Sequence, residues 1–509
     1  MSRLSSLVRP AAQCLASLIL FAPPAAGQDD FSELRQRARD GSKWTRQRAV
    51  EELAALDRLE AWELVVAALE DQKGEVADTA QLVLAALDGP EELKLLLGKQ
   101  GLRARDAWVR LRVAEVLGRL EVPVSTEVLE RALGDDDEHV RRAGAWSVQR
   151  LAAAGRLQGD GKFERALARR FQREREPGVR ARLLAALVQA APDLGRAALE
   201  EAVRARESEL RAMACRVLAL GAGEAIAARE LGRLAGDSQR AVRSAALDAL
   251  AALRTRAALE VLVERLVAED DEPLAARLVR TLQALSGLKH RADPRPWRDW
   301  LRALPEDWRA ERGPEALEPE PPDRNASQSV SFAGMPILSK RIAFLIDLSG
   351  SMWTPDATGR TPKDVVAEEL ARALSSLAPD TLFQLVPYTE HPRPWKKEAV
   401  PATPGNVRAA IRFFEDLNDR GTGNFWDAAM FALEDETVDT LCVLTDGAPT
   451  GGRRHRLELI VPLFEELDET RSVAVDSLLV DATRKLRNAW SDLARRTGGR
   501  SMAVDLSGP

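Results

Sequence analysis

The chain has 509 residues, more than one domain usually holds, so its length predicts roughly two to four domains. Its 73 basic and 79 acidic side chains leave a net charge of −6, and the lack of a basic surplus argues against a nucleic-acid partner. Aromatic residues make up 5% of the chain, whereas alanine, leucine and arginine are abundant, a composition that favours helices.

Residues 1–27 have the features of a secretory signal peptide. Arg3 and Arg9 give a basic start, a mostly apolar run covers 11–22, and the small residues 25–27 offer a cleavage position. The apolar run is short for a membrane span, and an uncleaved amino-terminal anchor is the alternative. We therefore expect an exported protein, periplasmic, extracellular or envelope-associated, with no membrane span after cleavage.

A repeat of about 32 residues organises residues 28–304. In each unit a polar turn leads into an apolar residue, often followed by arginine, and then into a helix rich in alanine and leucine. One helix pair cannot cover its own apolar face, so neighbouring units must stack into an α-solenoid. The pattern resembles short-period HEAT-type repeats, which implies a scaffold or a binding surface. The matching position is held by Val76, Val109, Val140, Val179, Leu210, Val242 and Leu274.

Three tryptophans, Trp297, Trp300 and Trp308, mark the end of the repeats. A terminal repeat needs an atypical closing surface, so we expect them to cap the last helix pair. An aromatic binding patch is the alternative. Residues 305–336 are rich in proline and acidic residues with little to bury, which predicts an extended linker.

Residues 337–509 alternate predicted strands and helices. This alternation predicts an α/β, doubly wound, mainly parallel sheet with helices on both faces. The predicted fold class is therefore multidomain, an all-α HEAT-like solenoid followed by a Rossmann-like α/β domain. In such sheets a site lies outside the carboxyl ends of the strands, where the winding reverses.

Oxygen-bearing side chains follow two of the predicted buried strands. Asp347, Ser349 and Ser351 come directly after one strand, and Asp446 ends another. Thr422 lies in a short glycine-rich stretch before a predicted helix. Carboxylate and hydroxyl oxygens suit Mg²⁺ or Mn²⁺ better than zinc, which prefers histidine and cysteine.

This order of pieces resembles a von Willebrand factor A (vWA) domain with its metal-ion-dependent adhesion site. The resemblance implies a Mg²⁺ ion, with Mn²⁺ or Ca²⁺ as substitutes, and a partner's acidic side chain that completes its coordination. In one departure, Gly423 stands between the threonine and the helix, where the family more often has threonine directly before the helix. The ligands that the resemblance implies are Asp347, Ser349, Ser351, Thr422 and Asp446.

The function predicted from these features is a protein–protein interaction scaffold. The metal site would capture an acidic residue of one partner, because an open position on a hard cation attracts a carboxylate. The solenoid would offer the second binding surface. The basic stretch 453–456 is expected near the metal, where its positive charge would help to draw in the partner.

The chain carries no recognisable enzyme motif, and we predict that it is not an enzyme. Its four histidines show no metal-ligand spacing, and neither a nucleophile elbow nor a phosphate-binding loop is present. Three alternatives remain open: a metal-dependent hydrolase acting at Asp347, a HEAT-type lyase, and an envelope scaffold with a vestigial metal site.

Four side chains carry further expectations. Cys215 and Cys442 fall in a helical and a buried-strand pattern, which predicts two buried free thiols. Near the predicted metal site, Trp426 is expected in the domain core and Trp353 on the surface.

Overall fold

The computed structural model describes residues 28–158, 160–313, 330–355 and 359–504. The predicted signal peptide and half of the predicted linker, residues 314–329, lie outside these residues, and the domain boundaries stay predictions. Contacts within the chain group it into two compact units, 1–200 and 201–509. Among the described residues, the helices are too short or too polar to span a membrane.

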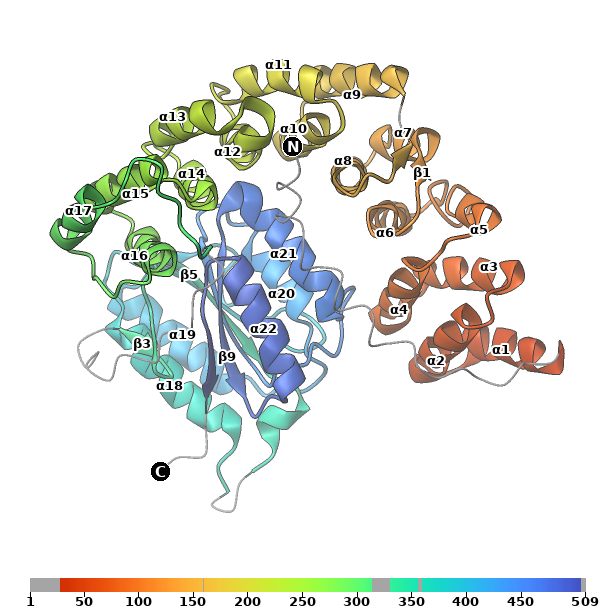
Figure 1. Cartoon of the computed structure of the whole chain (residues 1–509). Helices are drawn as coiled ribbons and strands as arrows, with labels where there is room; N and C mark the ends of the chain where they lie inside the picture. The colour runs from red at the N-terminus through yellow and green to blue at the C-terminus, as the bar shows by residue number, and fades with distance from the viewer. Residues whose placement is uncertain (1–27, 159, 314–329, 356–358, 505–509) are drawn as a thin grey trace. The chain divides into compact units, whose positions relative to one another are not determined.

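The first unit is built from helices that pack as neighbours along the chain (Figure 1). Helix α8 packs against α6, α7 and α10, and α2 packs against α1, α3 and α4. A capping aspartate begins several of these helices, as Asp137 does for α8, because its carboxylate accepts free backbone N–H groups. The helices are α1 (Gln28–Asp40), α2 (Lys43–Ala54), α3 (Leu59–Ala67), α4 (Gly74–Leu84), α5 (Pro90–Leu95), α6 (Ala107–Leu117), α7 (Thr126–Leu133), α8 (Glu138–Ala153), α9 (Gly161–Arg173), α10 (Pro177–Ala190) and α11 (Pro192–Ala202).

An arginine just after the apolar repeat position ties successive turns together. Arg211, for example, donates to the carbonyls of Ala205 and Arg206 in its own turn and to both carboxylate oxygens of Asp237 in the next. We call this series the arginine ladder, and each of its pairs lies within one unit. The pairs are Arg110–Asp135, Arg141–Glu174, Arg211–Asp237 and Arg243–Glu269, and Arg46, which follows Thr45, forms the same kind of pair with Asp71.

The second unit begins with the last repeats. Trp297 on the final helix is fully buried and lies edge-to-face against Trp300, which packs edge-to-face against Trp308. Helix α17 packs on α15, so the predicted aromatic cap is confirmed. Cys215 is buried with a free thiol, as expected. The helices are α12 (Ser208–Ala222), α13 (Glu224–Leu234), α14 (Arg240–Leu253), α15 (Arg256–Ala268), α16 (Glu272–Ser286) and α17 (Pro294–Arg302).

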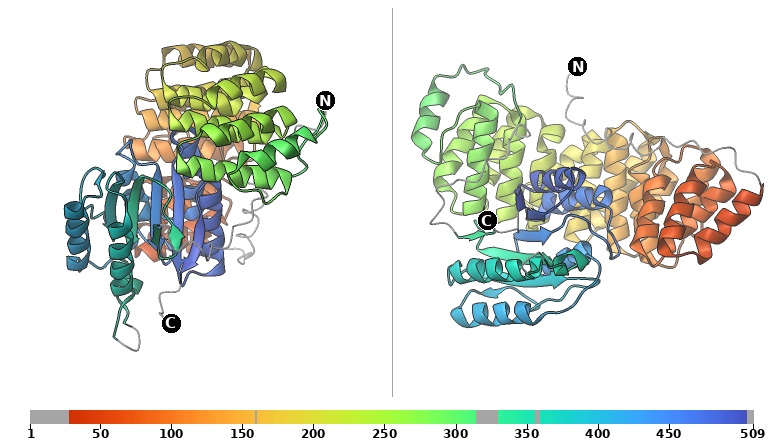
Figure 2. Two further views of the ribbon diagram at one scale, coloured as in Figure 1. Left: turned by 90° about the vertical axis from the view of Figure 1, so that its left-hand side faces the viewer. Right: turned by 90° about the horizontal axis from the view of Figure 1, so that it is seen from below.

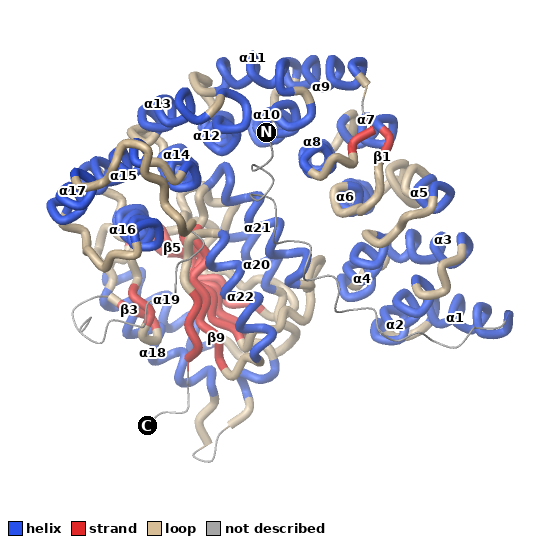
Figure 3. The backbone as a smooth tube through the Cα atoms, in the orientation of Figure 1, coloured by secondary structure: helices blue, strands red, loops and turns tan. Residues whose placement is uncertain are grey.

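A six-stranded sheet forms most of the rest of the second unit (Figure 3). Its strand order is β10-β9-β8-β5-β6-β7. Neighbouring strands run parallel except for the short edge strand β7, which is antiparallel to β6. The predicted α/β, mainly parallel sheet is therefore confirmed. The strands are β5 (Arg341–Asp347), β6 (Leu382–Tyr388), β7 (Val400–Pro401), β8 (Thr440–Thr445), β9 (Ala474–Val480) and β10 (Ser501–Val504), and a small hairpin, β3 (Ser331–Phe332) with β4 (Met335–Pro336), precedes them.

Helices cover both faces of this sheet (Figure 2). Alternate residues of β5 enter the two cores: Ala343 and Leu345 join one, and Phe344 joins the other. Both faces are buried, which explains why the strand reads as a continuous apolar run. The helices are α18 (Pro362–Ser376), α19 (Pro404–Asp416), α20 (Phe425–Ala432), α21 (Leu457–Arg471) and α22 (Arg484–Arg496).

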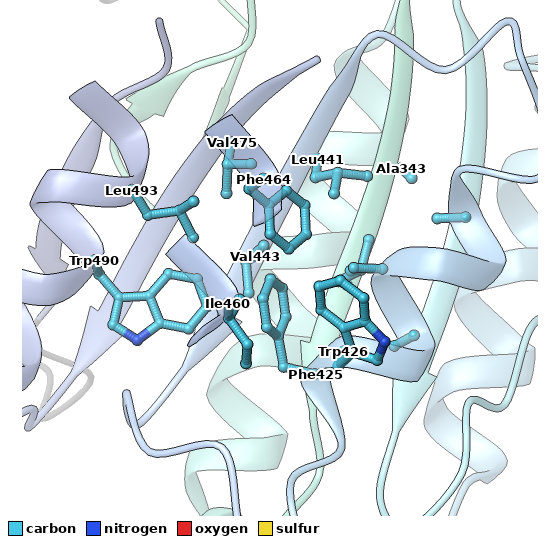
Figure 4. Packing of buried hydrophobic residues seen from close by; sticks show 14 of the residues in the cluster. Ala343, Phe425, Trp426, Leu441, Val443, Ile460, Phe464, Val475, Trp490 and Leu493 are labelled. Carbon is cyan, nitrogen blue, oxygen red and sulfur yellow. The ribbon is translucent and has the colours of Figure 1, made fainter. Parts of the chain in front are cut away.

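One core joins α20, α21 and α22 to the sheet through aromatic side chains (Figure 4). Phe425 stacks on Phe464 and meets Trp490 edge-on, and Trp426 also meets Phe464 edge-on. Trp426 is 9% exposed, so its predicted place in the core is confirmed. Cys442 is buried in the opposite core, as expected of a free thiol in a central strand.

Within the second unit the repeats contact the sheet domain through polar groups. Arg216 of α12 pairs with Asp468 of α21, and Arg240 of α14 donates to the Ser472 carbonyl just before β9. Arg341, the first residue of β5, pairs with Asp271 at the start of α16. The repeats thus contact the edge where β5 and β9 begin.

Candidate metal centre

The two predicted acidic ligands lie at the carboxyl ends of adjacent central strands. Asp347 is the last residue of β5, and Asp446 directly follows β8. The two strands pair in parallel, with Ile346 opposite Leu444. Parallel pairing in this register places both carboxylates at one edge of the sheet, as the strand pattern predicts.

The Asp347 carboxylate is buried, with 1% of the residue exposed. Its Oδ1 accepts the Ser349 backbone N–H at 2.8 Å, and its Oδ2 accepts the Thr445 hydroxyl at 2.9 Å. Burial raises the pKa of Asp347 to about 6, and the nearby negative charge of Asp446 adds to the rise. A carboxylate buried beside a second one is costly unless a cation balances the charge, so this pair suits a metal ion.

The two serines lie on the turn that leaves β5. Ser349 is mostly buried and forms a parallel bridge with Gly421. Ser351 lies in the 3-10 turn Gly350–Trp353, and its side chain is outside the described residues. The turn therefore lies beside the segment that carries Thr422.

Gly423 lies next to the Asp347 carboxylate. A Cβ added there would lie 3.0 Å from Asp347 Oδ2 and 3.3 Å from Oδ1, so this residue faces the carboxylate. The Thr422 hydroxyl lies against Gly451, where an added Cβ would come within 2.4 Å of it. Thr422 as a ligand stays a prediction. Gly423, the residue at which this sequence departs from the family pattern, is the one that faces Asp347.

Three supporting residues were not anticipated. Thr445 donates to Asp347, and the Thr450 hydroxyl accepts the N–H of Gly423 at 2.8 Å, which braces the glycine-rich stretch. Asn424 caps α20 and donates to the carbonyl of Glu390 at 2.8 Å. Only the place of Thr445, directly before Asp446, could have indicated its role, because the other two contacts depend on loop geometry.

The rim of the site differs from expectation at one tryptophan. Trp353 is partly buried, because its indole N–H donates to the carbonyl of Leu348 at 3.0 Å and its ring packs on the core beneath α18. Within the basic stretch 453–456, which follows Gly451 beside Thr422, Arg454 is 1% exposed, and its guanidinium lies 5.5 Å from the centre of the Trp426 ring. Of this stretch, Arg453 is exposed.

The donor set favours a hard cation. Among the described residues, no three histidine, cysteine, aspartate or glutamate side chains are grouped as a metal site would require. The candidate centre instead combines two carboxylates with hydroxyl oxygens, which fits Mg²⁺, Mn²⁺ or Ca²⁺ and not zinc. The residues present therefore fit the ion that the resemblance implies.

Comparison with known proteins supports both parts of the architecture. The HEAT repeat family model matches residues 99–188 and 195–283. Over 126 residues the chain is 31% identical to inter-alpha-trypsin inhibitor heavy chain H3 of Bos taurus, a match that covers 22% of this chain and 14% of that protein. The chain thus spans a small part of this relative.

Solved structures with similar parts include the VWA domain of SpRpn10 and a complex of CpcE and CpcF of phycocyanin lyase from Nostoc sp.. The first is 16% identical, with a TM-score of 0.27, and the match covers 33% of this chain and 89% of that one. The second is 18% identical, with a TM-score of 0.28, over 56% of this chain and 98% of that one.

Proposed function

We propose that this protein, which joins HEAT repeats to a vWA-type domain, is a non-enzymatic interaction scaffold with a metal-dependent site. The sheet domain would bind Mg²⁺, or Mn²⁺ or Ca²⁺, between Asp347 and Asp446, with the serine hydroxyls nearby. An aspartate or glutamate of a partner protein would complete the coordination. The solenoid would hold a second partner, and export through residues 1–27 belongs to the same proposal.

The observation that carries this proposal is the buried Asp347 carboxylate beside Asp446. Backbone and hydroxyl donors orient Asp347 before any ion arrives. When bound, the ion would supply a positive centre for an external carboxylate. Two carboxylates with neutral hydroxyls can leave a coordination position to the partner, because Mg²⁺ takes six oxygens.

The described contacts between the repeats of the second unit and the sheet domain lie away from the candidate metal centre. Arg341 begins β5 and pairs with Asp271, whereas Asp347 ends the same strand. The strand has seven residues, so its two ends lie roughly 20 Å apart. The repeats of the second unit therefore dock at the edge away from the candidate metal centre, and the groups they use there are not available to a partner.

The enzyme alternatives find less support in the described site. A hydrolase acting at Asp347 needs a general base close to the ion. Asp347 accepts hydrogen bonds from a backbone N–H and a hydroxyl and is proposed as a metal ligand, so its own carboxylate is not available as that base. A HEAT-type lyase, which would act through the repeats, and an envelope scaffold with a vestigial metal site both stay open.

A calorimetric titration of the full chain with MgCl₂ and MnCl₂ tests the metal site. We expect binding by the natural chain and by Asp380→Asn, a matched control whose exposed carboxylate pairs with Lys340 near the start of β6. Asp347→Asn should bind at least tenfold more weakly, because it removes the charge of the central ligand. Equal binding by all three proteins would exclude Asp347 as a ligand, and no binding by any would favour the vestigial site.

A further inference from the structure

A cation stacked on an aromatic ring marks the rim of the candidate metal centre. The exposed Arg420 guanidinium lies 4.8 Å from the centre of the Trp353 ring. The ring is anchored to the turn after β5 by its hydrogen bond to Leu348. Gly421, which follows the arginine, pairs with Ser349 of that turn. Arg420 is therefore held beside the loops that carry the predicted ligands.

The charges around this rim distinguish Arg420 from its neighbours. Arg393 pairs with Asp419, and Arg360 pairs with Glu368. Across the described parts of the domain, no acidic side chain lies within ion-pair distance of Arg420. Glu390 lies beside Gly421, so the rim also has an acidic member.

An arginine stacked on an aromatic face keeps the edge of its guanidinium free for hydrogen bonds. That edge presents N–H groups in a planar fork, which matches the two oxygens of a carboxylate. Stacking on the indole also restricts the side chain, so less freedom is lost when a ligand binds. The group thus suits a second carboxylate close to the one that reaches the ion.

We propose that Arg420, supported by Trp353, binds a second acidic side chain of the partner segment whose first acidic side chain completes the metal site. The partner of this site is then a peptide segment with two nearby carboxylates. This inference rests on the proposed function, because it requires metal-dependent capture of a carboxylate.

The experiment compares the full chain with its Arg420→Ala variant in excess Mg²⁺. The probes are fluorescein-labelled Gly/Ser peptides with one glutamate, or with two glutamates separated by one, two or three residues, and anisotropy reports their binding. The natural chain should bind at least one doubly acidic peptide about three- to tenfold more tightly than the singly acidic peptide. Arg420→Ala should lose this preference and keep its affinity for the singly acidic peptide.

Further variants separate a direct contact from a structural effect. Arg420→Lys keeps the charge without the planar fork and should recover only part of the preference. Arg408→Ala is the matched control, because this exposed arginine lies in the second turn of α19 and the described residues offer it no ion pair. Arg408→Ala should bind the peptides as the natural chain does. All three variants should unfold at the same thermal midpoint as the natural chain.

The outcomes distinguish the two proposals. A preference that persists in Arg420→Ala, with binding still lost in EDTA and in Asp347→Asn, would overturn this inference and leave the metal-dependent capture intact. Peptide binding that neither EDTA nor Asp347→Asn weakens would overturn both. A lack of binding by every peptide would also overturn both proposals.

Discussion

At the scale of single residues, the candidate centre depends on a glycine as much as on its carboxylates. Gly423 does not require a positive φ, so its backbone would accept a side chain. The space around Gly423 would not accept a side chain, because a Cβ would come as close as 3.0 Å to the Asp347 carboxylate. The absence of a side chain at this position therefore lets the glycine-rich stretch lie against Asp347.

We predict that Gly423→Ala weakens metal binding about tenfold or more, because the methyl group displaces the carboxylate that orients the ion. The cost in folding stability should be about 1–3 kcal/mol, as for other overpacked sites. A calorimetric Mg²⁺ titration measures the first effect and urea unfolding the second. Gly405→Ala is the control, since nothing lies within 4 Å of a Cβ there. Undiminished affinity in Gly423→Ala would show that this contact does not position Asp347.

At the scale of elements, the arginine ladder explains how the repeats keep their spacing. Each arginine bonds to its own turn and to the acidic residue of the next, so it links neighbouring helix pairs without using their apolar faces. Burial opposes ionisation of Asp237, but the hydrogen bonds from Arg211 and the Gln239 N–H, together with the positive charge of Arg211, outweigh burial and lower the pKa of this carboxyl. The lowered pKa means that the charged pair stabilises the folded state.

Asp237→Asn should therefore lower the free energy of unfolding by about 1–3 kcal/mol at neutral pH, because both side chains of the pair are largely buried. The stabilisation by Asp237 is present above its unfolded pKa of about 3.9 and is lost as the pH falls through its lower folded pKa. The difference between the two proteins should thus shrink below about pH 4. Urea unfolding at several pH values, followed by circular dichroism, measures it.

The control for this prediction is Asp270→Asn, whose side chain is 96% exposed and should change stability by less than about 0.5 kcal/mol. A difference for Asp237→Asn that stays constant from pH 7 to pH 3 would show that its charge does not stabilise the ladder.

At the scale of the second unit, the repeats and the sheet domain share a polar interface. Arg216 and Arg240 reach across to Asp468 and Ser472, while Asp439, just before β8, pairs with both Arg240 and Arg341. Helices α12 and α14 also pack directly on α21. The sheet domain is thus held by repeat helices far from it in sequence, in addition to the covalent connection.

We predict that the double variant Arg216→Ala/Arg240→Ala separates the unfolding of the sheet domain from that of its neighbouring repeats. Hydrogen bonds to charged groups contribute about 1.5–3 kcal/mol each, so losing several of them should uncouple the two parts. Differential scanning calorimetry should resolve an additional transition, and hydrogen exchange should rise around 468–472. Arg229→Ala, on the exposed face of α13, should leave both unchanged. An unchanged calorimetric trace in the double variant would show that packing on α21 alone holds the interface.

Much of this architecture follows from periodicity alone. The 32-residue repeat predicts stacked helices because each pair leaves an apolar face uncovered. The alternation of strands and helices predicts the parallel sheet, and strand direction then places Asp347 and Asp446 at one edge. These conclusions need only local patterns, so the sequence was sufficient for them.

Tertiary structure alone decided what the loops and surfaces do. It placed Gly423 against Asp347, buried Arg454 on Trp426, and directed Arg216 and Arg240 toward the sheet domain instead of an outside partner. Each of these contacts joins residues whose distance is set by loop geometry or by packing between elements far apart in the chain. Local periodicity carries no information about such distances, because they arise only when the separate elements pack together.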